Sequence, residues 1–193
     1  MANPVFTDIF DSNLNDNNTT TGTNLDDVIL GDNGNDILTG LAGNDLLFGN
    51  NGNDTINGGL GNDIINGGNG DDILIGGAGT DTITDGDGDD IYKYFSTSES
   101  QVGVTRDILT DFTSGFDKID LSAIDAELLT AGDQAFKFIG TAAFTGTAGE
   151  VRYFTSGSNL FVQAEINNDG NITADLEIQL NGLSTIAATS FIL

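Results

Sequence analysis

Large apolar residues recur every nine positions between residues 22 and 93, and polar residues and glycine fill the positions between them. The eighth position of each of the eight units is large and apolar, as at Ile29, Leu38, Leu47, Ile56, Ile65, Leu74, Ile83 and Tyr92. A strict period of this size is typical of a solenoid, in which each unit repeats one turn and one local site.

The other positions of the unit predict how it folds. Glycine recurs at positions one, two and four, where a tight turn needs positive φ or close backbone approach. We expect positions one to six to form the turn and positions seven to nine a short strand. The eighth residue would then point into a narrow core, and its two neighbours would point outward. Two units would complete one coil, and successive coils would stack their strands in parallel.

The sixth position is aspartate in every unit: Asp27, Asp36, Asp45, Asp54, Asp63, Asp72, Asp81 and Asp90. Stacking places each turn over the turn two units earlier, so two carboxylates and several carbonyl oxygens would line each gap. An oxygen-only site with about six ligands suits Ca²⁺, whereas Mg²⁺ keeps its waters and zinc or copper favour other donors. Eight units on two sides predict about six interior Ca²⁺ sites.

A metal-free solenoid stabilised by asparagine ladders is the alternative interpretation. Asparagine fills the fifth position at Asn35, Asn44, Asn53 and Asn62. However, carboxylates stacked about 4.8 Å apart would repel one another without a cation. The aspartate row therefore favours calcium.

Composition agrees with a cation-binding protein. The 193 residues include 30 acidic and 5 basic side chains, a net charge of −25, which disfavours nucleic acid and anionic membranes as partners. The chain contains no Cys and no His, which excludes disulfides, thiolate sites, Ser-His-Asp triads and zinc-protease motifs. It has no apolar run long enough to span a membrane. The first residues lack the pattern of a cleavable signal peptide, so we expect export by another route.

Three regions follow from these patterns. Residues 1–21 form a polar lead-in, with loop expected over 11–20 and a short cap on the first repeat as a lesser alternative. Residues 22–93 are the repeat array. Residues 94–193 predict a β-rich cap, with antiparallel strands over 160–166 and 176–180, a hairpin from 150–155 through a turn at 156–159, and a short helix within 119–130.

The repeats resemble the RTX (repeats-in-toxin) nonapeptides of bacterial proteins exported by the type I pathway, as in GGLGNDIIN and GGNGDDILI. The resemblance implies an all-β fold: a right-handed parallel β-roll with Ca²⁺ in both rows of turns, capped by a C-terminal antiparallel β region. It also implies that the ligands are the eight aspartates together with turn carbonyls. Those carbonyls would come from Asn33, Gly34, Ala42, Gly43, Asn51, Gly52, Leu60, Gly61, Asn69, Gly70, Ala78 and Gly79.

The region after the array, beginning RDILTDFTSGFDKIDLSAIDA at Arg106, resembles the C-terminal domain of serralysin-type metalloproteases. The resemblance implies that Glu99 and Asp107 cap the last calcium site. It also implies a calcium-dependent folding and secretion module of an extracellular protein, with the type I secretion machinery as a partner. The protease domain itself is absent, because a chain without His has no HExxH motif, so we expect no enzymatic activity.

Three departures from the family pattern concern the ends. The first unit has Leu25 at position four, and the last has Asp85 at position one and Tyr92 at position eight. Atypical end units are expected of a solenoid. The terminal Phe191-Ile192-Leu193 lacks the acidic residue that usually precedes such a triplet in the family, which weakens the inference of export.

Several weaker patterns have two interpretations. Residues 165–173 resemble the start of an EF-hand loop, but a hairpin turn is favoured. The irregularly spaced Asp111, Asp117, Asp120 and Asp125 could include a glycosidase-type carboxylate pair, but chance spacing is favoured in so acidic a chain. Asp117 with Lys118 is interpreted as a surface pair or a turn contact.

Two further binding functions were weighed against calcium-dependent folding. The aromatic set Phe136, Phe138, Phe144 and Tyr153 favours core packing over sugar stacking. A carbohydrate-associated or adhesive module on the same roll is the alternative function. Ice binding is disfavoured, because only Thr82 and Thr84 supply paired hydroxyls on the outward face.

Overall fold

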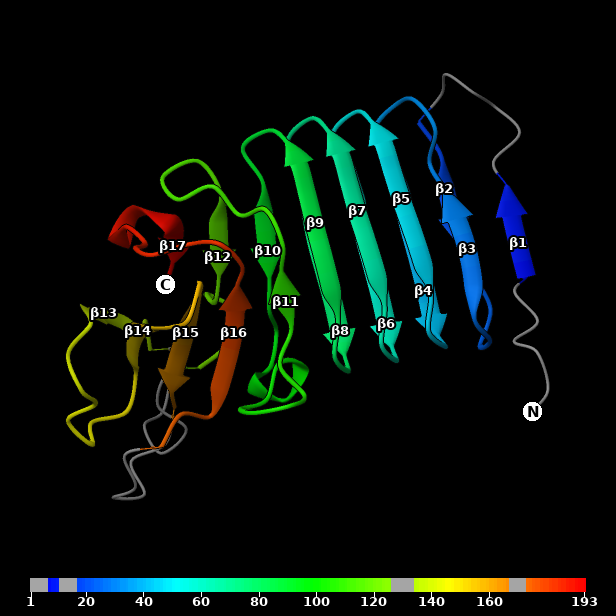
Figure 1. Cartoon of the computed structure of the whole chain (residues 1–193). Coiled ribbons are helices and arrows are strands. Elements are labelled where there is room, and N and C mark those ends of the chain that lie inside the picture. The colour runs from blue at the N-terminus through cyan, green and yellow to red at the C-terminus, as the bar shows by residue number, and fades with distance from the viewer. Residues whose placement is uncertain (1–6, 11–16, 126–133, 167–172) are drawn as a thin grey trace.

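The computed structural model describes residues 7–10, 17–125, 134–166 and 173–193. In these ranges the chain forms a ten-stranded and a seven-stranded β-sheet and two short 3-10 helices, η1 (Thr97–Glu99) and η2 (Ala188–Ser190) (Figure 1). The strands are β1 (Thr7–Phe10), β2 (Thr19–Thr21), β3 (Asp27–Leu30), β4 (Ile37–Ala42), β5 (Leu46–Asn51), β6 (Thr55–Leu60), β7 (Ile64–Asn69), β8 (Ile73–Ala78), β9 (Thr82–Asp87), β10 (Ile91–Lys93), β11 (Ile108–Leu109), β12 (Lys118–Asp120), β13 (Lys137–Gly140), β14 (Glu150–Ser156), β15 (Asn159–Glu165), β16 (Leu176–Leu180) and β17 (Phe191–Ile192).

The repeat array winds as a right-handed roll between the two sheets (Figure 1). Odd-numbered strands β3 to β9 lie side by side in one sheet, and even-numbered strands β4 to β10 lie in the other. Each strand pairs in parallel with the strand two units later, as Leu47 with Ile65 and Ile56 with Leu74. The predicted coil of two units and the predicted parallel β-roll are therefore confirmed.

The core of the roll consists of two rows of eighth-position side chains, one row from each sheet. All eight are at most 1% exposed, whereas the seventh-position residues Ile37 and Ile64 are each 49% exposed. Burying one such aliphatic side chain stabilises the fold by about 1.5–3 kcal/mol. The predicted inward and outward positions are confirmed.

The strands are longer than the unit predicts. Strands β4 to β9 run from position seven through position three of the next unit, as in Ile37–Ala42, so the turn between them is confined to positions four to six. Pairing skips position one and then resumes, with Leu41 opposite Gly59 and Ala42 opposite Leu60. The prediction of a six-residue turn was wrong, because the ladder continues after the corner at position one.

The roll also extends beyond the repeats on both sides. β1 pairs with β3 and β2 with β4, so residues 19 and 20, expected as loop, belong to a strand of the seven-stranded sheet. Residues 11–16 lie outside the described ranges. On the other side β11 pairs with β9 and β12 with β10, both in parallel. The stack of coils thus passes without interruption into the C-terminal region.

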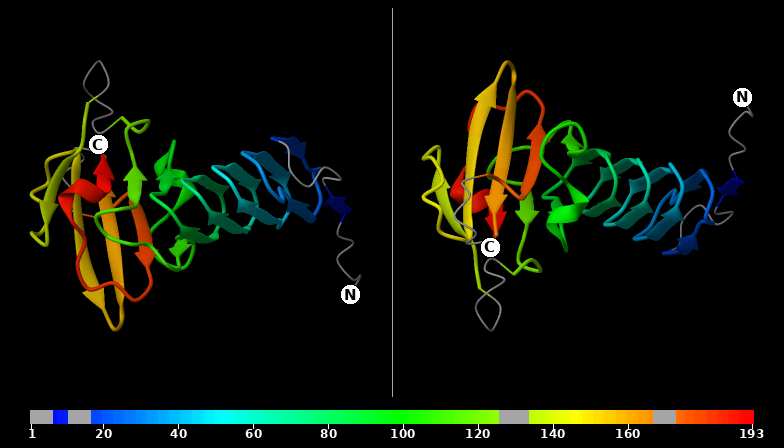
Figure 2. Two further views of the ribbon diagram at one scale, coloured as in Figure 1. Left: turned by 90° about the horizontal axis from the view of Figure 1, so that it is seen from above. Right: turned by 90° about the horizontal axis from the view of Figure 1, so that it is seen from below.

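The C-terminal region widens the end of the roll (Figure 2). β16 joins β11 in parallel, and β15 and β14 continue the same sheet in antiparallel order. The predicted hairpin is confirmed: Ser156 pairs with Asn159 around the turn formed by Gly157 and Ser158. The helix expected within 119–130 was wrong at its start, since residues 119 and 120 belong to β12, and residues 126–130 lie outside the described ranges.

Apolar and polar residues alternate along the antiparallel strands β15 and β16, a pattern typical of strands that expose one polar face. Instead Gln163, Glu165 and Glu177 are 8%, 1% and 5% exposed. Arginine side chains cover this face: the Arg106 guanidinium lies over the Phe161 ring, 4.9 Å from its centroid. The strands are therefore buried on both sides, which alternation alone does not predict.

No helix in the part of the chain that the structure describes is long and apolar enough to cross a membrane.

The core of eighth-position side chains predicts the effect of mutating Ile65, which is fully buried in β7. We expect Ile65→Ala to lower the free energy of unfolding by about 2–5 kcal/mol, because it leaves a cavity between two coils. Chemical denaturation in saturating Ca²⁺ measures this. The matched control is Ile64→Ala, which removes the same atoms from the neighbouring outward position. Equal losses of unfolding free energy for the two variants would contradict a core built from the eighth-position side chains.

Candidate metal centre

The sixth-position aspartates form two straight rows, one along each edge where the chain enters a sheet. Each residue immediately precedes or begins a strand, and all eight are at most 1% exposed. The rows continue past the repeats, through Asp107 before β11 and Asp117 before β12. One row is Asp27, Asp45, Asp63, Asp81 and Asp107, and the other is Asp36, Asp54, Asp72, Asp90 and Asp117.

A repeated hydrogen bond joins the members of each row. The backbone N–H of each aspartate donates to Oδ1 of the aspartate one coil later, for example Asp45 to Asp63 at 2.8 Å and Asp54 to Asp72 at 2.7 Å. The other oxygen, Oδ2, is buried without a hydrogen-bond partner in Asp45, Asp54, Asp63, Asp72, Asp81, Asp90 and Asp107. Buried polar atoms in folded proteins nearly always have a partner, so this row of orphaned oxygens requires one.

The first-position glycine leaves room for these oxygens. A Cβ on Gly58 would lie 2.2 Å from Oδ2 of Asp63 and 2.6 Å from the carbonyl oxygen of Gly76. The carboxylate oxygen and the carbonyl of the next coil thus border one small space that only glycine leaves open. Gly40, Gly49 and Gly67 have the same surroundings. Such oxygen-only surroundings fit a hard divalent cation.

The fourth-position glycine serves the close stacking of coils. Gly61 has a φ of +132°, and a Cβ there would lie 1.7 Å from the carbonyl oxygen of Gly43. Its N–H donates to the carbonyl of Ala78 at 2.8 Å. The third- and fourth-position residues named as carbonyl ligands therefore lie at the turn edge, with coils in direct contact. Which of their carbonyls bind a cation stays a prediction.

The first row ends in a polar cluster that includes Glu99 and Asp107. Asp107 accepts the N–H of Asp81 at 2.9 Å, and its Oδ2 is orphaned. The Tyr94 hydroxyl is buried beside Asp107 without a hydrogen bond of ordinary geometry. Glu99 accepts the N–H of Phe95 at 3.0 Å and adds negative charge near Asp81 and Asp107. Their role as ligands remains a prediction.

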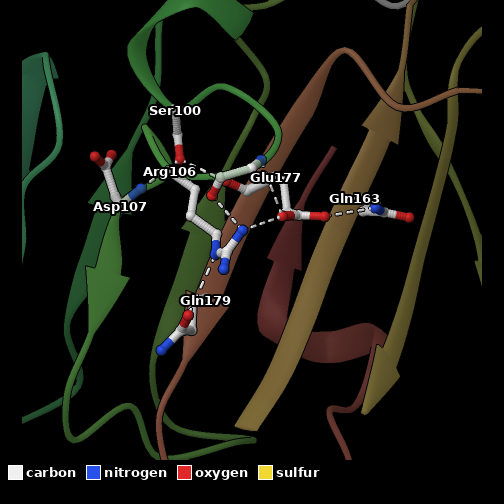
Figure 3. A network of polar contacts seen from close by, with 7 residues as sticks. Ser100, Arg106, Asp107, Gln163, Glu177 and Gln179 are labelled. Atoms are coloured by element: carbon white, nitrogen blue, oxygen red, sulfur yellow. Dashed lines mark hydrogen bonds and ion pairs between the residues drawn. The ribbon is translucent and has the colours of Figure 1, made fainter. Parts of the chain in front are cut away.

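A polar network fixes Asp107 to the C-terminal strands (Figure 3). The Ser100 hydroxyl accepts the N–H of Asp107 at 2.8 Å and donates to the carbonyl of Glu177 at 2.6 Å. Arg106 pairs with the Glu177 carboxylate at 2.7 Å and donates to Gln179 at 3.2 Å. The last aspartate of the row is thus held by β16 rather than by another repeat.

The family model for the C-terminal domain of M10 peptidases of the serralysin type matches residues 13–193. The chain belongs to this family. The match covers the two aspartate rows and the strands that cap them, so the recognised resemblance is confirmed. Among curated proteins, no match was found.

Two solved structures are similar to this serralysin-type domain. The AlgE6R2 subunit of mannuronan C5-epimerase from Azotobacter vinelandii is 21% identical, over 99% of this chain and 92% of that one, with a TM-score of 0.49. The AlgE6R3 subunit of the same enzyme is 22% identical, over 93% of this chain and 79% of that one, with a TM-score of 0.38.

The sequence analysis missed the role of Asp117. It was interpreted as a surface pair with Lys118 or a turn contact, but it is 2% exposed and accepts the N–H of Asp90 at 3.2 Å. It does close a turn, because its Oδ2 accepts the N–H of Thr113. A usable signal was present: Asp107 and Asp117 each precede a buried apolar residue, Leu109 and Ile119, by two positions, as the repeat aspartates do.

Asp120 and the aromatic set, two of the other weak candidates, make structural contacts. Asp120 pairs with Lys93 at 3.3 Å. Phe136 and Phe144 are buried, and Phe138 and Tyr153 pack against the core, which confirms the packing interpretation. The loop that resembles an EF-hand falls mainly on residues 167–172, outside the described ranges. In the first unit, Asp27 turns its Oδ2 toward the N–H of Thr23, which is the altered turn expected beside Leu25.

Burial makes the rows costly to ionise. It raises the pKa of Asp54, Asp81 and Asp90 to about 6, of Asp63 and Asp72 to about 7, and of Asp107 to about 8. These pKa values lie above the ordinary value of 3.8. The metal-free roll therefore holds more protons than the unfolded chain above about pH 4, and its stability falls as the pH rises through the raised pKa values.

We therefore predict that Asp63→Asn changes stability with opposite signs in the two metal states. Without calcium at pH 7.5 it should stabilise the roll, because a neutral amide avoids the cost of burying a carboxylate charge. The amide N–H can also donate to the nearby carbonyl of Gly76. With Ca²⁺ it should weaken binding about tenfold, because a charged ligand is lost. Sulfate-driven folding of the metal-free chain and a Ca²⁺ titration, both followed by circular dichroism, measure the two effects.

The matched control is Asp71→Asn, at an exposed fifth position. Asp71 accepts the N–H of Asp89 at 3.0 Å in a ladder where Asn53 already performs the same role. This variant should shift neither curve by more than a small amount. A change of the same sign for Asp63→Asn in both metal states would show that its carboxylate does not face a cation.

Proposed function

We propose that this chain is a calcium-binding module that folds when Ca²⁺ fills its aspartate rows. The observation that carries the proposal is the file of buried Oδ2 atoms without partners, repeated coil after coil. A divalent cation offers both the missing partner and the missing positive charge. Calcium suits such a site, since it accepts six to eight oxygen ligands in flexible geometry, including carboxylates and carbonyls.

Charge explains why folding would depend on the metal. Each row brings like charges into adjacent coils, and the chain as a whole carries −25. The two ion pairs among the described residues, Lys93–Asp120 and Arg106–Glu177, involve carboxylates outside the rows. Without a cation, a neutral-pH roll must leave several desolvated carboxylates uncompensated or protonate them. Because the site exists only in the folded chain, binding free energy becomes folding free energy.

The same dependence supports an export function. A chain that is unfolded at the low Ca²⁺ of a bacterial cytoplasm can pass through a secretion channel, and millimolar Ca²⁺ outside then folds it. Membership of the serralysin C-terminal family supports this proposal. We therefore propose type I secretion as its route, and a non-catalytic folding and secretion role for the chain.

A calcium titration tests the folding function. At pH 7.5 in excess chelator we expect a circular dichroism spectrum with little β structure, and a cooperative rise in β signal as free Ca²⁺ increases. Mg²⁺ at equal concentration should give a much smaller change, because it dehydrates reluctantly. Asp125→Asn, which changes an acidic residue outside both rows, should titrate like the parent chain. A complete β spectrum in chelator would overturn the proposal.

Export requires its own experiment. We expect the chain, produced in a bacterium that carries a type I exporter, to accumulate in the medium only when the exporter is active. The matched control is the same strain with an inactive exporter ATPase. Mutations that weaken calcium binding should leave export intact while preventing folding outside. Equal amounts of chain in both media would exclude this route.

A further inference from the structure

The last repeat unit departs from the others at its first position. Units one to seven begin with glycine, and the eighth begins with Asp85. Asp85 is 1% exposed, so its carboxylate lies inside the turn edge, and its Oδ2 has no hydrogen-bond partner. The substitution therefore places a third carboxylate where every other coil has only the space beside glycine.

Three carboxylates meet at this point. One oxygen each from Asp85, Asp90 and Asp117 lies within 4.8 Å of the other two, and all three residues are buried. Calcium binds oxygen at about 2.3–2.6 Å, so oxygens on opposite sides of one ion lie up to about 5 Å apart. The three oxygens can therefore surround a single cation. Asp85 and Asp90 come from the last repeat, and Asp117 comes from the turn before β12.

A second, uncharged group points to a ligand at the same place. Tyr92, from the eighth position of this unit, is fully buried, and its hydroxyl has no hydrogen-bond partner of ordinary geometry. That hydroxyl lies beside Asp85, and the carboxylates of Asp111 and Asp117 are also near it. Its ring is held against Phe112, with 5.8 Å between centroids. The buried hydroxyl and the Asp85 carboxylate therefore border the same small space.

Among the residues that the structure describes, no ion pair joins a basic side chain to Asp85, Asp90 or Asp117. Asp111, opposite Asp85 in the ladder, accepts its N–H at 3.0 Å and adds a fourth acidic group at the rim. Lys93, the basic residue of this unit, pairs with Asp120 instead. Burial, and after it the neighbouring carboxylates of Asp111 and Asp117, raises the pKa of Asp85 above its ordinary value.

We propose that Asp85, Asp90 and Asp117, with the Tyr92 hydroxyl, form a separate divalent-cation site that clamps the last repeat to the C-terminal cap. It differs from the repeat gaps in having three carboxylates rather than two, and it holds Ca²⁺ more tightly because affinity rises with ligand charge. The proposal rests on the calcium-dependent fold proposed above but concerns a site outside the nine-residue pattern.

Terbium luminescence tests this site, because Tb³⁺ replaces Ca²⁺ and emits when a nearby tyrosine is excited. The chain has three tyrosines and no tryptophan. In a Tyr94→Phe background, which removes the tyrosine at the other row's end, we expect sensitised emission from Tyr92 at the lowest Tb³⁺ concentrations, displaced by Ca²⁺. Asp85→Asn should weaken this binding step about tenfold, and Tyr92→Phe should abolish the emission.

Asp89→Asn is the matched control, because it makes the same change in the same repeat unit at an exposed position outside both rows. It should leave the Tyr92-sensitised step unchanged. Asp85→Gly, which restores the residue of the other seven units, should behave like Asp85→Asn and guards against a folding defect caused by the amide. Emission that is unaltered in both Asp85 variants would overturn the site.

Circular dichroism on the same samples separates this outcome from failure of the folding function. Asp85 variants that still fold with Ca²⁺ but keep the full emission step would overturn the three-carboxylate site and leave calcium-dependent folding standing. A parent chain that does not respond to Ca²⁺ at all would overturn the folding function first. Loss of the emission step in folded Asp85 variants would support both.

Discussion

Two rows of buried carboxylates impose the main constraint on this fold. Most coils present an aspartate whose Oδ1 accepts a hydrogen bond from the coil before it and whose Oδ2 has no hydrogen-bond partner. The Oδ1 atoms need no further partner, because hydrogen bonds such as that from the Asp45 N–H to Asp63 Oδ1 join successive turns. The Oδ2 atoms and the negative charge of the carboxylates do need a further partner. A polypeptide cannot stack desolvated like charges without protons or cations to offset them.

The glycine pattern follows from the same constraint. At position one, a side chain would occupy the space beside the orphaned oxygen, as the contacts around Gly58 show. At position four, a side chain would collide with the carbonyl of the previous coil, as around Gly61. The repeat therefore combines a geometric requirement for close stacking with an electrostatic requirement for open oxygen-lined space. Burial of the apolar side chains at position eight contributes stabilising free energy that offsets the cost of these two requirements.

The sequence predicted the regular part of the molecule well because the period repeats one physical solution. The coil, the parallel register of 18 residues and the inward Ile65 all follow from it. Prediction failed where the period stops. Asp107 and Asp117 follow their predecessors by 26 and 27 residues rather than 18, so no count reveals that Asp117 extends a row. The covering of Glu177 by Arg106 depends on contacts between distant strands, which strand alternation does not encode.

The two ends of the rows near the cap use similar substitutes for a missing repeat. At each end an aspartate outside the repeats, Asp107 or Asp117, completes the row, and a buried tyrosine hydroxyl, Tyr94 or Tyr92, lies near it. In each case the final aspartate belongs to the segment that forms the cap rather than to the roll. A cation bound there would contact both, whereas a cation between repeats contacts only coils. The ends of the rows are therefore where metal binding can couple the stability of the roll to that of the C-terminal sheet.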